Sequence, residues 1–134
     1  MSTRLGPSSP RAPETIDVAA RAVSQSLTSL TGRSITFRAS RPGSGAPQQY
    51  AVDFDASGQQ LSVFAFDESV PEAAMAMLNS LTDLLSERWW GTAIPPCPGH
   101  SHPLRPVCDD QGVVTWECPR DGRTVAQLWP IVAD

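Results

Sequence analysis

Residues 94–131 read IPPCPGHSHPLRPVCDDQGVVTWECPRDGRTVAQLWPI, and this stretch determines how the C-terminal part of the chain can fold. It contains every cysteine and histidine of the 134-residue sequence, all of them between Cys97 and Cys118. Five prolines between Pro95 and Pro106 exclude a regular helix there, because proline lacks the backbone N–H and clashes with the preceding helical turn. We therefore expect loops and short strands arranged around the cysteine and histidine side chains.

The spacing of these side chains is typical of a structural zinc site. Two short motifs, Cys97-Pro-Gly-His100 and Cys118-Pro-Arg-Asp121-Gly122, resemble the two knuckles of a zinc ribbon. Two ligand pairs separated by roughly 15–20 residues are usual for such sites. Both motifs depart from the Cys-x-x-Cys pattern, because histidine and aspartate stand where the second cysteine is expected. The predicted ligands are Cys97, His100, His102 and Cys118, with Cys108 and Asp121 as alternatives for the fourth position.

Other interpretations of the segment stay open at this stage. An irregular loop without metal, or a ribbon that has lost its ion, accommodates the same residues. A disulfide is disfavoured, since three cysteines leave one thiol unpaired. Disulfides are also rare in the cytoplasm, where we expect this chain because it has no apolar run of the length that a secretory signal needs.

The sequence favours a structural site over a catalytic one. A catalytic zinc ion keeps one coordination position open and usually has a carboxylate base nearby. Glu117 is the closest acid on the predicted strand, and strand alternation directs it away from the face of Cys118. No HExxH motif, His-x-Glu signature or glycine-rich phosphate loop occurs in the chain.

Hydrophobic periodicity upstream changes from helical to strand-like and back. Apolar residues at helical spacing predict a helix that begins near Pro13 and ends at Gly32. The alternation of apolar and polar residues then predicts three antiparallel strands, at residues 35–40, 50–55 and 60–66.

A second helix is predicted from Val70 to Arg88, with Ser69 as its N-cap and Glu72 completing a capping box. Two further strands are predicted near the C-terminus, at residues 113–116 and 125–129. The order α-β-β-β-α-β-β predicts an α+β fold. It consists of an antiparallel sheet with two packed helices and a C-terminal zinc-ribbon-like hairpin module.

Three regions follow from this pattern: a disordered tail at 1–13, the α-β-β-β-α core at 14–91, and a zinc-binding hairpin at 92–134 packed on the core. The chain carries a net charge of −4, and its ten basic residues are all arginine. Nucleic-acid binding is disfavoured, because few arginines accompany the acidic second half. We also expect no membrane span, because no apolar run is long enough.

The four tryptophans are candidate contacts for a protein partner, because tryptophan is enriched at binding hot spots. They are Trp89, Trp90, Trp116 and Trp129. The predicted function is accordingly a non-enzymatic, zinc-stabilised protein-binding or adaptor protein. The alternatives are a zinc-dependent hydrolase with an open coordination position and a redox- or metal-responsive regulator.

The pattern CPGH-x-HPL followed by W-x-CP, within residues 89–122, resembles a group of small actinobacterial proteins with a C-terminal Cys/His motif. The absence of lysine is also typical of GC-rich actinobacterial genomes. This resemblance implies metal binding and assigns no reaction. The element order is similar to that of type III secretion chaperones in topology, and topology by itself assigns no function.

Overall fold

The computed structural model describes residues 14–43, 45, 47–90 and 92–131. The predicted tail at 1–13 and the last three residues of the hairpin module lie outside the described residues. The elements, in chain order, are α1 (Glu14–Thr31), β1 (Ile35–Pro42), β2 (Gln49–Ala56), β3 (Gln59–Phe66), α2 (Val70–Arg88), β4 (Arg105–Cys108), β5 (Val114–Glu117) and β6 (Thr124–Trp129). The predicted α+β class is confirmed.

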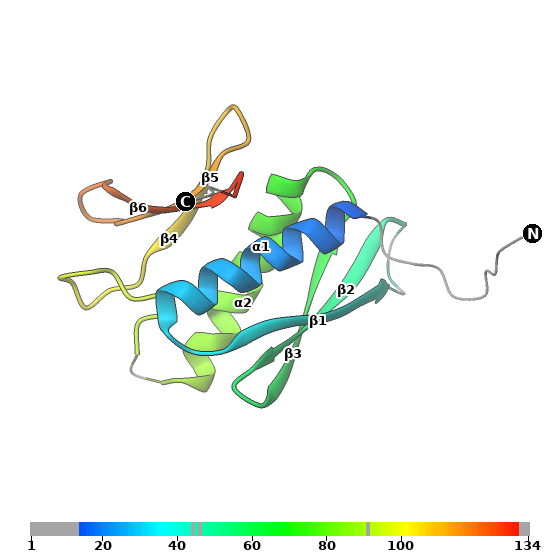
Figure 1. Ribbon diagram of the computed structural model, residues 1–134, viewed down its shortest axis with the longest axis horizontal. Coiled ribbons are helices and arrows are strands. Elements are labelled where there is room, and N and C mark those ends of the chain that lie inside the picture. The colour runs from blue at the N-terminus through cyan, green and yellow to red at the C-terminus, as the bar shows by residue number, and fades with distance from the viewer. Residues whose placement is uncertain (1–13, 44, 46, 91, 132–134) are drawn as a thin grey trace, which may run out of the picture.

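The two helices lie between two separate antiparallel sheets (Figure 1). The first sheet has the strand order β1-β2-β3, and the second has the order β4-β5-β6. α1 packs on β1 and α2 packs on β3, while the same helices contact β6 and β4 of the second sheet. The helix layer is therefore covered by a sheet on each side.

Both helices form because apolar residues recur every three or four positions and face this shared core. The buried side chains of the helices are Ile16, Ala19, Ala20, Ala22, Val23, Leu27, Ala73, Ala74, Met77, Leu78, Leu81 and Leu85. Neither helix combines the length and the apolar character that crossing a membrane requires.

The predicted capping residues are in place at the start of α2. The Glu72 N–H donates to the Ser69 hydroxyl oxygen at 3.2 Å, and that hydroxyl donates to the Glu72 carboxylate at 2.9 Å. We expect Ser69→Ala to lower the free energy of unfolding by about 1 kcal/mol, because it leaves a helix N–H without its acceptor. Urea unfolding measures this change. Ser80→Ala, on an exposed position of the same helix, is the control, and equal losses in both variants would contradict the capping role.

The first sheet owes its register to a two-residue turn between β2 and β3. Ser57 and Gly58 have positive φ angles of 52° and 93°, the backbone that a two-residue hairpin turn requires. The Gly58 N–H also donates to the Asp55 carboxylate at 2.8 Å. The turn pairs Ala56 with Gln59, and this pairing sets which side chains of both strands face the helices.

The second sheet contains one strand more than the predicted two-stranded hairpin. The additional strand, β4, includes Pro106, which lies opposite Trp116 of β5. β4 is an edge strand, and proline is tolerated there because its missing N–H faces no neighbouring strand. The proline-rich stretch that begins at Pro95 therefore ends in a β-strand and does not continue as a loop.

Trp116 attaches the second sheet to the helices. Its side chain is fully buried, and its indole N–H donates to the Ser26 hydroxyl of α1 at 2.7 Å. The prediction of Trp116 as a partner contact is therefore wrong: strand alternation turns it toward α1, where it becomes a core residue. Apart from Ala51, the buried residues of both sheets and both helices form one cluster.

Candidate metal centre

The first loop of the candidate metal centre spans residues 95–104, between α2 and β4. Its two ends are held together by the backbone. The Leu104 N–H donates to the Pro95 carbonyl at 2.8 Å, and Pro96 forms an isolated antiparallel bridge with Pro103. The prolines therefore brace a closed loop, and the side chains between them are held at fixed positions.

A tight turn lies inside this loop and aims the side chains of Cys97 and His100 at one point. The His100 N–H donates to the Cys97 carbonyl at 3.0 Å, and the Cys97 N–H donates to the His102 carbonyl at 3.3 Å. Gly99 has a φ of 80°, a conformation that costs glycine little.

The second loop repeats this arrangement directly after β5. The Cys118 N–H donates to the Arg123 carbonyl at 2.9 Å, and the Gly122 N–H donates back to the Cys118 carbonyl at 2.8 Å. Gly122 has a φ of 74°, close to that of the glycine in the first loop. The two motifs that the sequence pairs as knuckles are thus both tight, glycine-containing turns.

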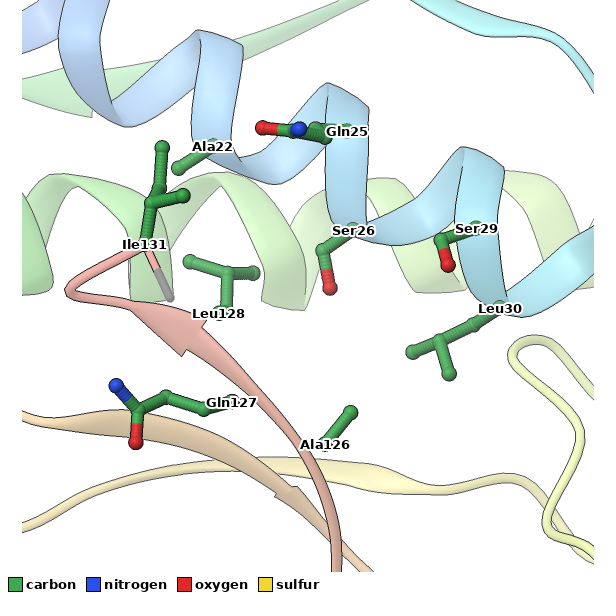
Figure 2. Close-up of a pocket in the computed structure, with 9 residues that line it drawn as sticks. All are labelled: Ala22, Gln25, Ser26, Ser29, Leu30, Ala126, Gln127, Leu128 and Ile131. Carbon is green, nitrogen blue, oxygen red and sulfur yellow. The ribbon is translucent and has the colours of Figure 1, made fainter. Parts of the chain in front are cut away.

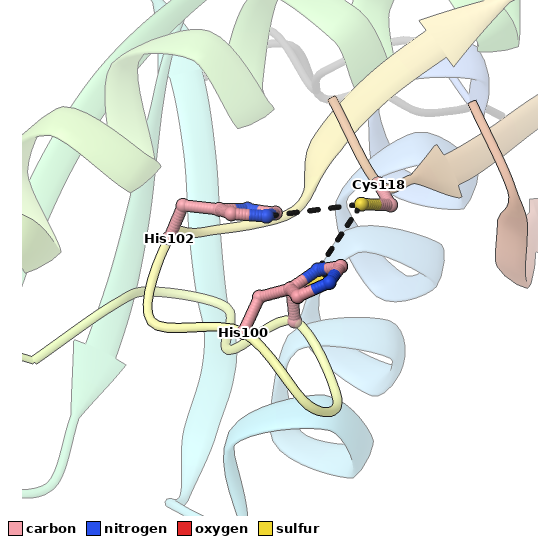
Figure 3. A group of neighbouring side chains, drawn as sticks. His100, His102 and Cys118 are labelled. Carbon is pink, nitrogen blue, oxygen red and sulfur yellow. Dashed lines mark hydrogen bonds between the residues drawn. The ribbon is translucent and has the colours of Figure 1, made fainter. Parts of the chain in front are cut away.

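The structure brings the four predicted ligands together. Their sulfur and nitrogen atoms all lie within 4.8 Å of one another. The His100 Nδ1 atom is 3.4 Å from Cys97 Sγ and 3.3 Å from Cys118 Sγ, and His102 Nε2 is 3.7 Å from Cys118 Sγ. Figure 3 shows both imidazoles pointing at the Cys118 sulfur, which arrives from the opposite loop. The group therefore joins segments 16 to 18 positions apart in the sequence.

These separations fit one tetrahedral zinc ion. Zinc binds cysteine sulfur at about 2.3 Å and histidine nitrogen at about 2.1 Å. Ligand atoms at those distances in a tetrahedron are about 3.6 Å apart, and three sulfur–nitrogen contacts of 3.3 to 3.7 Å bracket this value, while all pairs lie within 4.8 Å. A mixed set of two sulfurs and two imidazoles is one of the usual donor sets of structural zinc.

A backbone carbonyl holds the His102 ring in the tautomer that a metal ligand needs. His102 Nδ1 lies 3.1 Å from the carbonyl oxygen of Pro103. A carbonyl only accepts, so Nδ1 carries the proton and Nε2 presents its lone pair to the cluster. Histidine ligands are commonly oriented in this way by a second hydrogen bond. The role of the Pro103 carbonyl could not be read from ligand spacing.

The two sulfurs are buried, whereas the two imidazoles reach solvent. Burial raises the pKa of the Cys97 thiol above its ordinary value, and the neighbouring Cys118 raises it further. Without a cation, the Cys97 thiol is thus driven toward its protonated form. A divalent cation bound beside it reverses this preference, because the thiolate is the form that binds metal.

The two alternative ligands, Cys108 and Asp121, lie outside the four-residue group in the described part of the chain. Cys108 is exposed at the end of β4. The Asp121 carboxylate accepts the Arg123 N–H at 2.9 Å, and this bond lowers the pKa of the Asp121 carboxyl. Asp121 therefore shapes the second loop.

The remaining tryptophans differ in exposure. Trp90 is 89% exposed. Trp89 is partly buried, with the Arg33 guanidinium stacked 4.2 Å from its ring centre. Trp129, at the end of β6, is partly buried against the core. Trp90 alone among the four thus presents nearly its whole side chain to solvent.

A pocket that sequence reasoning missed lies between α1 and β6 (Figure 2). It has a volume of about 210 Å³ and is lined by small apolar and uncharged polar side chains. Ser26, which holds Trp116, is one of them. The pocket is formed by a helix and a strand from opposite ends of the chain, so no local sequence pattern predicts it.

Comparisons of the chain with protein-family models, with curated proteins and with solved structures found no match.

Proposed function

We propose that this chain is a non-enzymatic protein-binding module whose second sheet is held in place by one structural zinc ion. The observation that carries the proposal is the convergence of Cys97, His100, His102 and Cys118 from two separate loops. Four protein ligands complete a tetrahedral site, which is the arrangement of structural rather than catalytic zinc.

Zinc would add a cross-link to the apolar packing of Trp116 and its neighbours that already attaches the second sheet to the helices. β4 and β5 have only four residues each, so the backbone pairing between them is short. The ion would join the loop before β4 to the loop after β5. Its binding free energy would then contribute directly to folding of the sheet.

The hydrolase alternative is less well supported. All four tetrahedral positions have a protein ligand within reach, which leaves none for water. Glu117, the closest acid on β5, lies 3.7 Å from the Arg105 guanidinium of the neighbouring strand, in a cross-strand ion pair. The Glu117 carboxylate is thus paired with an arginine of β4.

One observation favours the redox-responsive alternative as a second candidate. The Cys97 and Cys118 sulfurs are neighbours within the cluster, so hydrogen peroxide could oxidise the two thiolates to a disulfide and release the ion. The two electrons from the sulfurs and two protons from solvent would reduce the peroxide to two water molecules. Zinc that is released by mild peroxide and rebound after thiol reduction would support this function. Zinc retained under peroxide would exclude it.

Metal analysis of the purified protein tests the structural site. We expect about one equivalent of zinc per chain, falling below half in His102→Ala, because three ligands hold the ion less tightly than four. Cys108→Ala is the matched control and should keep its zinc, since Cys108 lies outside the cluster. Less than about half an equivalent in the unaltered protein would contradict the proposal.

The protein-binding role is supported by Trp90, whose side chain is 89% exposed. An aromatic side chain of this size is a typical anchor for a partner. A partner bound through this residue should be retained by the unaltered protein and lost by Trp90→Ala at unchanged zinc content. Equal retention by both proteins would exclude Trp90 as the anchor.

A further inference from the structure

The free edge of β3 differs from the other sheet edges of the molecule. β3 reads QQLSVFAF and contains no charged residue and no proline over its eight residues. Along one edge it pairs with β2, and along the other it has no strand partner among the described residues. An unpaired edge of this length presents backbone N–H and C=O groups that another strand can bind.

The other edge strands carry features that hinder such pairing. β1 contains Arg38, Arg41 and Pro42, and its register shifts at a bulge after Phe37. β4 contains Arg105 and a proline, and the pairing of β6 is interrupted by two register shifts. Charges, prolines and bulges are the usual means by which proteins protect their sheet edges. β3 has none of them.

Two aromatic side chains extend the unprotected edge onto the open face of the sheet. Phe64 and Phe66 are 53% and 40% exposed, and they alternate with the buried residues Val63 and Ala65. They therefore lie on the face opposite to the helices. Aromatic side chains on neighbouring strands stabilise a sheet when they face each other across a strand pair.

The electrostatics of this face favour an identical strand as the partner. The nearby charges are already compensated, because Arg41 pairs with Asp53, and Arg38 lies 3.4 Å from Asp55. The acidic residues Asp67 and Glu68 follow the C-terminal end of β3. An antiparallel pair of β3 strands places these acidic ends at opposite ends of the contact, so no like charges meet.

We propose that β3 pairs in antiparallel orientation with β3 of a second copy of this chain, which joins the two first sheets into one continuous sheet. The contact is symmetric, as expected for a two-fold dimer. A register that places the Phe64 side chains of the two copies opposite each other pairs residues 62–66 of both chains and brings their aromatic rings together. The inference does not depend on the zinc site, which belongs to the other sheet.

Light scattering coupled to size-exclusion chromatography tests the pairing. The unaltered, zinc-loaded protein should have twice the chain mass of 14.4 kDa at high concentration and dissociate on dilution. Phe64→Lys should be monomeric at the same concentration, because it places like charges across the new strand pair. Thr36→Lys, on an exposed position of β1, is the matched control and should remain dimeric.

Hydrogen exchange distinguishes this dimer from other associations. The amides along the free edge of β3 should be protected at concentrations where the dimer forms and exchange faster on dilution. A protein that stays monomeric at every concentration would overturn the proposal. So would a dimer that Thr36→Lys dissociates and Phe64→Lys does not. Circular dichroism of both variants ensures that a lost dimer is not a lost fold.

Discussion

Cys118→Ser should abolish stoichiometric zinc binding and unfold the sheet formed by β4, β5 and β6. The Cys118 sulfur is fully buried and lies within 3.7 Å of both imidazoles, so its loss removes the one ligand of the group that comes from the second loop. Structural zinc in small domains contributes about 10–16 kcal/mol of apparent binding free energy. We expect less than half an equivalent of zinc, with loss of amide protection in β4–β6.

The control for this result is Cys108→Ser, which alters an exposed thiol outside the cluster. We expect it to keep both its zinc and the amide protection of the second sheet. Chelator treatment of the unaltered protein should reproduce the Cys118→Ser pattern. If β4–β6 stay protected after the metal is removed, the ion does not hold this sheet.

Trp116→Ala should lower the free energy of unfolding by about 3–5 kcal/mol, as is usual when a large buried aromatic side chain is removed. Trp116 is fully buried and bonded to Ser26 of α1, so the change opens a cavity between the second sheet and the helices. Urea unfolding followed by circular dichroism measures the loss. A decrease of this size is a large share of the stability of an ordinary domain.

Trp90→Ala serves as the matched variant, because it removes the same side chain from an exposed position. Surface substitutions of this kind usually change the unfolding free energy by about 0.5 kcal/mol or less. Comparable losses in the two variants would contradict the assignment of Trp116 to the core.

The elements from α1 to α2 were predictable because their patterns are local. Ser69 and Glu72 mark the start of α2 within four positions of each other, and the Ser57-Gly58 turn adjoins the strands that it connects. Each pattern lies inside one element or turn, where the spacing of residues along the sequence alone decides which side chains are neighbours.

The missed features depend on contacts between distant parts of the chain. β4 exists because its neighbour β5 returns after the turn that follows Cys108. Alternation places Trp116 on one face of β5, and only the docking of that sheet on α1 makes this face buried. The orientation of the His102 ring likewise depends on the Pro103 carbonyl, which ligand spacing does not encode.

The membership of Cys97 and Cys118 in the common buried cluster has a consequence for the lifetime of the protein in a cell. A ligand that binds only the folded chain raises its stability, and this gain is lost when the free ion becomes scarce. Less stable chains are removed faster by proteases. We therefore expect zinc starvation to lower the abundance of this protein at constant synthesis, so that its amount follows the local zinc supply.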